Sequence, residues 1–270
     1  MPYHKEHAAI SRIAQEVLRL TKKHFGTILQ VATKTDVRDI SSFLDHAIDR
    51  VIRKRISAAF PADILITEEF SPHLDPAHGR AWVVDPLCGS MNVARGVKFF
   101  ATNIALVEGG KVVAAWVIDH AREELIWGLG DKKVFQSAKA VRRLKYSSVM
   151  SVVEIEQAYY YKLPIVVQER IARFTADALL QKNITCYNYG SSLGFAYVAT
   201  GQLQAAVTVN IYPWDFIAAC FLIEQNGGIV TNFNGTPWNI RSKSIVMAGD
   251  KNIHRTLLRL LKKNKLDNLT

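Results

Sequence analysis

The first sixty residues alternate apolar and polar positions at helical spacing. Apolar residues recur every three or four positions between His4 and His24, and Gly26 follows as a stop signal. The same spacing resumes after Ser41 and Ser42, whose hydroxyl groups suit an N-cap, and it reaches about Phe60. The chain is therefore predicted to open with two amphipathic helices.

The middle of the sequence has the signature of strands. Its apolar runs are rich in Val, Ile and Trp, and a Gly-Gly pair at 109–110 stands where a hairpin would turn. The predicted strands lie within 64–67, 82–85, 103–119 and 124–129. They predict a mostly antiparallel sheet.

Beyond residue 147 short apolar strands alternate with helical patterns. Helices are predicted near 165–180, 192–200, 214–226 and 251–263. We therefore divide the chain into an N-terminal α+β half, 1–145, and a C-terminal α/β half, 146–270. No repeat or flexible linker separates them, so the two halves are expected to meet across a shared cleft.

Composition is that of a globular protein, with 270 residues of which 49% are hydrophobic and 21% charged. The sequence has no apolar run long enough for a bilayer and no signal peptide, which predicts a cytoplasmic protein without a membrane partner. Three widely spaced cysteines favour neither a disulfide framework nor a zinc knuckle. The net charge of +10 suits phosphorylated metabolites or other polyanions, but no motif supports a nucleic-acid or transcription partner.

Carboxylates stand at the ends of two predicted strands and at the start of a helix. Glu68 follows the strand in ILITEEF, Asp85 ends the strand in AWVVDPLCGSMN, and Asp215 lies in the first turn of the helix in PWDFIAA. Hard divalent cations such as Mg²⁺ prefer such oxygen ligands. Each acid alone is more often a cap or a surface charge, but the three with their flanking motifs indicate a metal site.

These blocks resemble the inositol monophosphatase-like superfamily of Mg²⁺-dependent, lithium-sensitive phosphatases. The resemblance runs through KTDVRDISSFLD, where it aligns Lys34, Asp39 and Asp45, then through TEEF, DPLCGSMN and WDFIAACFLIEQNGG, and covers about residues 5–265. The sequences ITEE and PWDF most resemble the corresponding motifs of the bacterial suppressor-protein branch. The resemblance implies a layered α-β-α-β-α sugar-phosphatase fold, a homodimer, and Mg²⁺, or alternatively Mn²⁺, as cofactor.

The same resemblance implies roles for single residues. Metal would be bound by Glu68, Asp85, the Leu87 carbonyl group and Asp215, and Ser90 would help Glu68 to orient the attacking water. Catalytic roles thus fall to Glu68, Asp85 and Ser90. The substrate would contact Cys88, Gly89, Ser90, Gly190, Ser191 and Asp215. The implied activity is hydrolysis of a small phosphomonoester, such as an inositol-phosphate-like, sugar or nucleotide phosphate.

Two positions depart from the family pattern. Cys88 stands where the family has its second motif aspartate, and a thiol suits softer metals than Mg²⁺. Loss of that carboxylate is expected to weaken a second metal site and to lower turnover. Thr208 aligns with a glutamate that contacts sugar hydroxyl groups in inositol-specific members, so inositol phosphate is not assigned as substrate.

Two alternatives are also compatible with the sequence. GSSLG fits a nucleophile-elbow pattern, and Ser192, Asp215 and His254 occur in the order of a hydrolase triad. The helices and hairpins before it disfavour that fold. The second alternative is a catalytically weak or inactive family member that binds protein or RNA as a regulator, which Cys88 and the basic charge favour.

Overall fold

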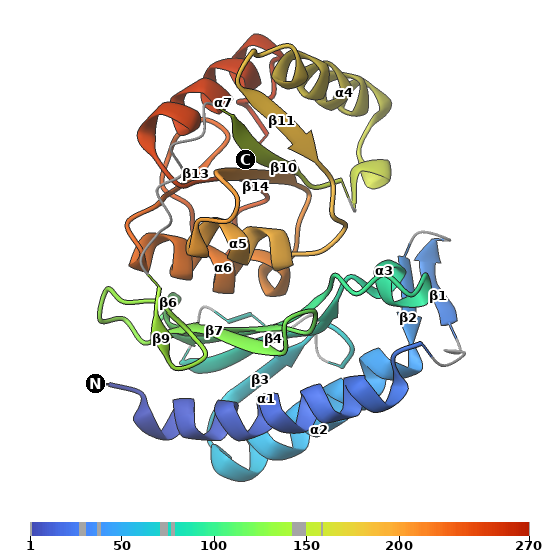
Figure 1. The fold of residues 1–270 in the computed structure, drawn as a ribbon, viewed down its shortest axis with the longest axis vertical. Coiled ribbons are helices and arrows are strands. Elements are labelled where there is room, and N and C mark those ends of the chain that lie inside the picture. The colour runs from blue at the N-terminus through green and yellow to red at the C-terminus, as the bar shows by residue number, and fades with distance from the viewer. Residues whose placement is uncertain are drawn as a thin grey trace.

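The computed structural model describes residues 2–26, 31–36, 39–70, 75–76, 79–141, 150–157 and 159–269, with side chains described outside 31–41. Figure 1 shows five stacked layers: a helix pair, a sheet, a second helix pair, a second sheet and an outer helix pair. This is the layered α-β-α-β-α arrangement expected from the sequence.

The first layer consists of α1 (His4–His24) and α2 (Phe43–Ala59), as the apolar spacing predicted. Helix α2 begins at a capping box, in which the Ser42 hydroxyl oxygen accepts from the backbone of Asp45 while the Asp45 carboxylate accepts from the Ser42 N–H. The apolar faces of both helices pack on one face of the first sheet, where Trp82 and Trp116 are fully buried.

The second layer is a seven-stranded sheet in the order β3-β4-β5-β6-β7-β8-β9. Strand β3 runs parallel to β4 and the other neighbours are antiparallel, so the prediction of a mostly antiparallel sheet is confirmed. The strands are β3 (Ile64–Thr67), β4 (Arg80–Cys88), β5 (Ala101–Glu108), β6 (Lys111–Asp119), β7 (Glu124–Gly128), β8 (Phe135–Gln136) and β9 (Lys139–Ala140).

Strand β4 carries an irregularity close to its end. Asp85 pairs with Asn103 of β5, but Cys88 pairs with Ala101, so β4 has one residue more than its partner over this interval. Proline lacks an N–H group and cannot complete a regular ladder, which places Pro86 naturally in such a bulge. The bulge re-aims the segment that carries the carboxylate motif.

The third layer consists of α5 (Leu193–Thr200) and α6 (Pro213–Gln225), which lie between the two sheets (Figure 1). Every residue of α5 is buried, and so are the residues of α6 from Trp214 to Ile223. A helix that is apolar all round requires cover on both sides. These two helices therefore join the cores of the two sheets.

The fourth layer is a five-stranded sheet in the order β11-β10-β12-β14-β13, and α4 (Ile165–Leu179) and α7 (Lys251–Lys263) cover its outer face (Figure 1). Strand β10 is parallel to both of its neighbours, whereas β14 is antiparallel to β12 and β13. The strands are β10 (Ser151–Ile155), β11 (Ile184–Tyr187), β12 (Ala205–Val209), β13 (Ile229–Asn232) and β14 (Ser244–Ala248).

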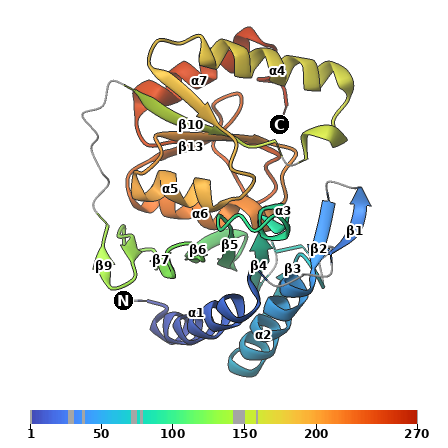
Figure 2. The ribbon, with the colours of Figure 1, turned by 45° about the vertical axis from the view of Figure 1, so that its right-hand side comes forward.

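Short elements complete the described chain. Strands β1 (Val31–Asp36) and β2 (Asp39–Ser42) form an antiparallel pair in a polar stretch for which the sequence predicted no strand. Figure 2 shows this hairpin beside α3 (Ser90–Ala94), and a 3-10 turn, η1 (Tyr160–Lys162), follows β10. The expected boundary between 145 and 146 lies outside the described residues. Among the described helices, none has the length and apolarity needed to cross a membrane.

Candidate active site

A cavity of about 120 Å³ lies where the end of β4 meets the loop before α5 and the first turn of α6. Both halves of the chain line it, and its lining includes every residue to which the family resemblance gave a ligand, catalytic or substrate role. The lining residues include Glu68, Asp85, Leu87, Cys88, Gly89, Ser90, Glu156, Tyr159, Gly190, Ser191, Ser192, Thr208 and Asp215.

Three side chains form a compact cluster in this cavity. One ligand atom each of Asp85, Cys88 and Asp215 lies within 4.8 Å of the other two. Asp85 accepts a hydrogen bond from the Leu87 N–H through Oδ1 at 3.0 Å, and Asp215 accepts from the Tyr212 N–H at 3.1 Å. Both carboxylates are buried, so their orientation is fixed by the start of the bulge and by the first turn of α6.

Glu68 lines the same cavity from the end of β3. Its backbone N–H donates to the Val84 carbonyl oxygen at 3.1 Å, so the parallel pairing of β3 with β4 continues one residue beyond the strand. This pairing brings Glu68 next to the end of β4, which explains how an acid seventeen positions earlier in the sequence shares a site with Asp85.

Cys88 joins the two halves at the cavity. Its Sγ accepts from the Ser192 N–H at 3.2 Å, and its carbonyl oxygen accepts from the Ser191 hydroxyl group at 2.8 Å. Burial raises the thiol pKa well above its ordinary value, and the negative charges of Asp85 and Asp215 raise it further. The cysteine therefore presents a neutral thiol to the two carboxylates.

Gly89 is the residue at which the chain turns from β4 into α3. Its φ is +112°, a value that side-chain-bearing residues rarely adopt. A Cβ atom here would lie 3.0 Å from the Phe100 Cβ and 3.2 Å from the Ser191 Cβ. Glycine thus permits both the turn and the close approach of the second half.

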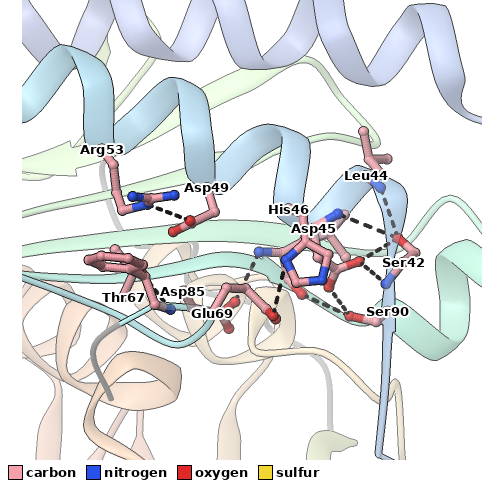
Figure 3. Close-up of polar contacts among 12 residues, drawn as sticks. Ser42, Leu44, Asp45, His46, Asp49, Arg53, Thr67, Glu69, Asp85 and Ser90 are labelled. Atoms are coloured by element: carbon pink, nitrogen blue, oxygen red, sulfur yellow. Dashed lines mark hydrogen bonds and ion pairs between the residues drawn. The ribbon is translucent and has the colours of Figure 1, made fainter. Parts of the chain in front are cut away.

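The carboxylate of Asp45, in the first turn of α2, supports the motif through Ser90, as Figure 3 shows. Asp45 accepts from the Ser90 hydroxyl group at 2.5 Å and from the N–H and hydroxyl group of Ser42. Burial raises the pKa of Asp45, while its hydrogen bonds to the two serines oppose that rise. Ser90 also has the Leu87 carbonyl oxygen 3.2 Å away, so it links α2 to the end of β4.

Several residues of the cavity were not predicted from the sequence, and two of them carry ionisable side chains, Glu156 and Tyr159. Glu156 follows β10 and is buried, a placement that the strand SVVEIE could have suggested because its acid stands at the strand's end. Burial raises the pKa of Tyr159 well above its ordinary value, and Asp215 and Glu68 add to the rise. Its ring packs edge-on against the Tyr212 ring, with the two centroids 5.2 Å apart. No local motif in the sequence predicted this contact.

The serine-hydrolase alternative is not supported by the described contacts. The Ser192 hydroxyl oxygen accepts from the Asn103 amide at 2.7 Å, whereas His254 is bonded to Thr231 at 2.9 Å. Among the described strands before GSSLG only two parallel pairs occur, β3 with β4 and β10 with β11, and such a hydrolase needs a longer run of parallel strands there. Lys34 and Asp39 belong to β1 and β2, but their side chains lie outside the described residues.

Known proteins resemble this chain in sequence and in structure. The chain is 26% identical over 231 residues to an inositol-1-monophosphatase of Bacillus subtilis, covering 85% of this chain and 86% of that protein. It is 25% identical over 252 residues to Nus factor SuhB of Salmonella typhimurium, with 92% of each chain covered. The crystal structure of the extragenic suppressor protein suhB from Bartonella henselae superposes with a TM-score of 0.85 at 25% identity, covering 95% of this chain and 98% of that one.

A family model supports the same relationship over nearly the whole chain. The model of the inositol monophosphatase family matches residues 4–266. This span contains both sheets and all the residues that line the cavity. The chain therefore belongs to the inositol monophosphatase family.

Proposed function

We propose that this protein hydrolyses a small phosphomonoester with the help of Mg²⁺ or Mn²⁺. The observation that carries the proposal is the cavity itself, in which Glu68, Asp85 and Asp215 converge from three separate elements. The family membership supports phosphatase chemistry, since a similar protein from Bacillus subtilis is an inositol-1-monophosphatase.

The carboxylates of the donor set fit a hard divalent cation, whereas the thiol of Cys88 in the same cluster fits it less well. Asp85, Asp215 and Glu68 would supply carboxylate oxygens, and Leu87, whose carbonyl group is a further candidate ligand, lines the same cavity. Cys88 contributes a protonated thiol instead of a further carboxylate. When bound, divalent ions in such sites activate water and neutralise the charge of the leaving group.

The side chains of the site would orient the attacking water and hold its proton. Glu68 is the carboxylate that would accept the proton. The Ser90 hydroxyl group donates its hydrogen bond to Asp45. The lone pairs of its oxygen can therefore accept a hydrogen bond from the same water. Asp45 thereby fixes the direction of the serine hydroxyl group from α2.

Other residues of the cavity would contact the phosphate and the organic part of the substrate. The backbone around Gly89 is the proposed phosphate contact, and Gly190 and Ser191 line the substrate end. Thr208 and Tyr159 add hydroxyl groups to the lining of the cavity, while Glu156 adds a carboxyl group. This mixture favours a small, hydroxylated phosphate ester. The homodimer that the resemblance implies belongs to the same proposal, and so does the cytoplasmic location predicted from the sequence.

Phosphate release from a panel of sugar, inositol and nucleotide monophosphates tests the proposal. The assay compares Mg²⁺, Mn²⁺ and a chelator, and it includes the variant Asp215→Ala. Metal-dependent turnover that is lost in the variant supports the proposal. Absence of turnover with every ester and both metals would overturn it.

A second function is a regulatory, non-catalytic role in binding protein or RNA. The likeness to Nus factor SuhB and the net charge of +10 favour it. Activity that emerges only in Cys88→Asp would favour this role, because the thiol would then be what separates the protein from an active phosphatase.

A further inference from the structure

Three buried side chains outside the cavity form a hydrogen-bonded chain behind β4. The Thr21 hydroxyl group of α1 lies 3.0 Å from Nδ1 of His120, and Nε2 of His120 lies 3.0 Å from the Thr102 hydroxyl group of β5. The exposed fractions of the three residues are 2%, 1% and 0% in chain order of Thr21, His120 and Thr102. None of them lines the cavity.

The direction of these hydrogen bonds follows from the last acceptor. The Thr102 hydroxyl group lies 2.7 Å from the Pro86 carbonyl oxygen, which can only accept, so Thr102 must donate its single proton there. Nε2 of His120 must then donate to Thr102, and Nδ1 accepts from Thr21. Burial lowers the pKa of His120 to about 3, with Lys98 contributing, which agrees with a neutral ring.

The chain of hydrogen bonds ends on a residue of the cluster. The peptide group between Pro86 and Leu87 accepts from Thr102 through its carbonyl oxygen and donates through the Leu87 N–H to Oδ1 of Asp85 at 3.0 Å. Hydrogen bonds in series polarise one another. The hydrogen bond that the Pro86 carbonyl oxygen accepts therefore makes the Leu87 N–H a stronger donor. All the bonds point from Thr21 towards the Asp85 carboxylate.

We infer that Thr21, His120 and Thr102 form a positioning relay, which orients the Asp85 carboxylate through the Pro86–Leu87 peptide group. Partners of this kind orient metal ligands in other proteins. The inference deepens the proposed function, since a metal role for Asp85 rests on it. The relay itself is a property of the hydrogen bonds and can be tested without metal.

Its location supports a role beyond packing. The relay meets β4 at the bulge between Asp85 and Cys88, where the regular ladder is interrupted and a side chain must satisfy the carbonyl group of Pro86. The His120 ring is held by Phe100, whose centroid lies 4.7 Å away in a stacked arrangement. A fixed ring and a fixed hydroxyl group leave the peptide group one orientation.

The first experiment is nuclear magnetic resonance of the metal-free protein labelled at histidine and leucine. The wild-type His120 ring is expected to carry its proton on Nε2. In Thr102→Val the acceptor for that proton is lost, so the ring should move its proton to Nδ1 and donate to Thr21, and the Leu87 amide proton should shift upfield. Thr102→Ser keeps the hydroxyl group and should preserve both signals. An unchanged Leu87 amide in Thr102→Val overturns the relay.

The second experiment measures Mn²⁺ affinity by titration calorimetry. Thr102→Val is expected to weaken binding on the order of tenfold, within the usual range for partners of metal ligands, while Thr102→Ser stays near the wild type. Thr231→Val is the matched control, because Thr231 is also a buried threonine bonded to a histidine, His254, and does not line the cavity. Equal weakening in both valine variants would overturn a specific role for the relay.

The variant His120→Gln separates the hydrogen bonds from the imidazole ring. A glutamine amide can donate to Thr102 and accept from Thr21, so Mn²⁺ affinity should be kept, whereas His120→Leu should lose it as Thr102→Val does. If the wild type binds no Mn²⁺, the proposed metal-dependent function fails. The Leu87 amide then still decides the relay by itself.

Discussion

The two ends of the segment from Asp85 to Cys88 are held in different ways. Asp85 is fixed from within the N-terminal half, by the Leu87 N–H and the buried chain of side chains behind it. Cys88 is fixed from the C-terminal half, by Ser191 and Ser192. The Asp85 end of the motif is therefore held by contacts within residues 1–145, whereas the Cys88 end is held by contacts with residues 146–270.

The ends also differ in charge. At the Asp85 end a carboxylate is kept in place, and at the Cys88 end burial and two neighbouring acids keep a thiol neutral. The carboxylate at the Asp85 end attracts a cation, whereas the neutral thiol at the Cys88 end adds no electrostatic attraction. The comparison predicts that substitutions at the two ends have effects of different size and different sign.

The largest effect is expected where both ends share a partner, at Asp215. Asp215→Asn removes a charge from the cluster but keeps an oxygen that can accept from the Tyr212 N–H. Loss of several kcal/mol of metal stabilisation corresponds to a fall of roughly 10²–10³ in kcat. Asp250→Asn, at the N-cap of α7, is the matched control and should leave kcat unchanged. A similar loss in both variants would contradict the assignment.

Acid should act on the Asp85 end through His120. An unfolded His120 binds a proton near pH 6.5, whereas the folded protein resists it down to a pKa of about 3. The stabilisation is thus complete above pH 6.5 and is lost as the pH falls towards 3, at up to about 1.4 kcal/mol per pH unit. Urea unfolding of the wild type and His120→Gln over this range measures it. Parallel stability curves for the two proteins would contradict it.

At the Cys88 end the expected change is a gain. Cys88→Asp adds a carboxylate to the cluster and should tighten divalent cation binding on the order of tenfold. Without metal, repulsion among three acids should lower the melting temperature, and Mg²⁺ should reverse this. Cys88→Ser, which adds no charge, should show neither change. Calorimetry and thermal unfolding with and without Mg²⁺ separate the outcomes.

The smallest effect is expected for the hydrogen bond from Ser191 to Cys88, which joins the two halves. Ser191→Ala removes the hydrogen bond to the Cys88 carbonyl oxygen and the acceptor for the Leu193 N–H. A loss of about 1 kcal/mol of unfolding free energy is expected. Chemical denaturation measures it, and metal affinity should hardly change. A tenfold loss of metal affinity would show that the Cys88 end is as critical as the Asp85 end.

Local patterns in the sequence predicted much of the fold. The periods of α1 and α2, the serine cap at Ser42 and the double glycine between β5 and β6 are each contained in a few neighbouring residues. The strand-end acids and the resemblance also indicated which residues meet in the cavity. Sequence order along the motifs was enough for these predictions.

Other features depend on contacts between distant segments. The meeting of Thr21 with His120 spans 99 positions, and the bond from Asn103 to Ser192 spans 89. Tyr159 follows no motif, and the polar residues of β1 and β2 lack the apolar alternation that marks a strand. These features follow from packing, which single-sequence patterns do not contain.

The hydrogen bond from the Ser192 N–H to Cys88 Sγ makes the hydrogen exchange of one amide a measure of contact between the two halves. The N–H belongs to the loop before α5 and its acceptor to β4, so deuterium can replace this proton only when the two segments part. The Leu87 amide, held within one half, needs no such parting. The ratio of the two exchange rates therefore measures how often the halves separate at the cavity.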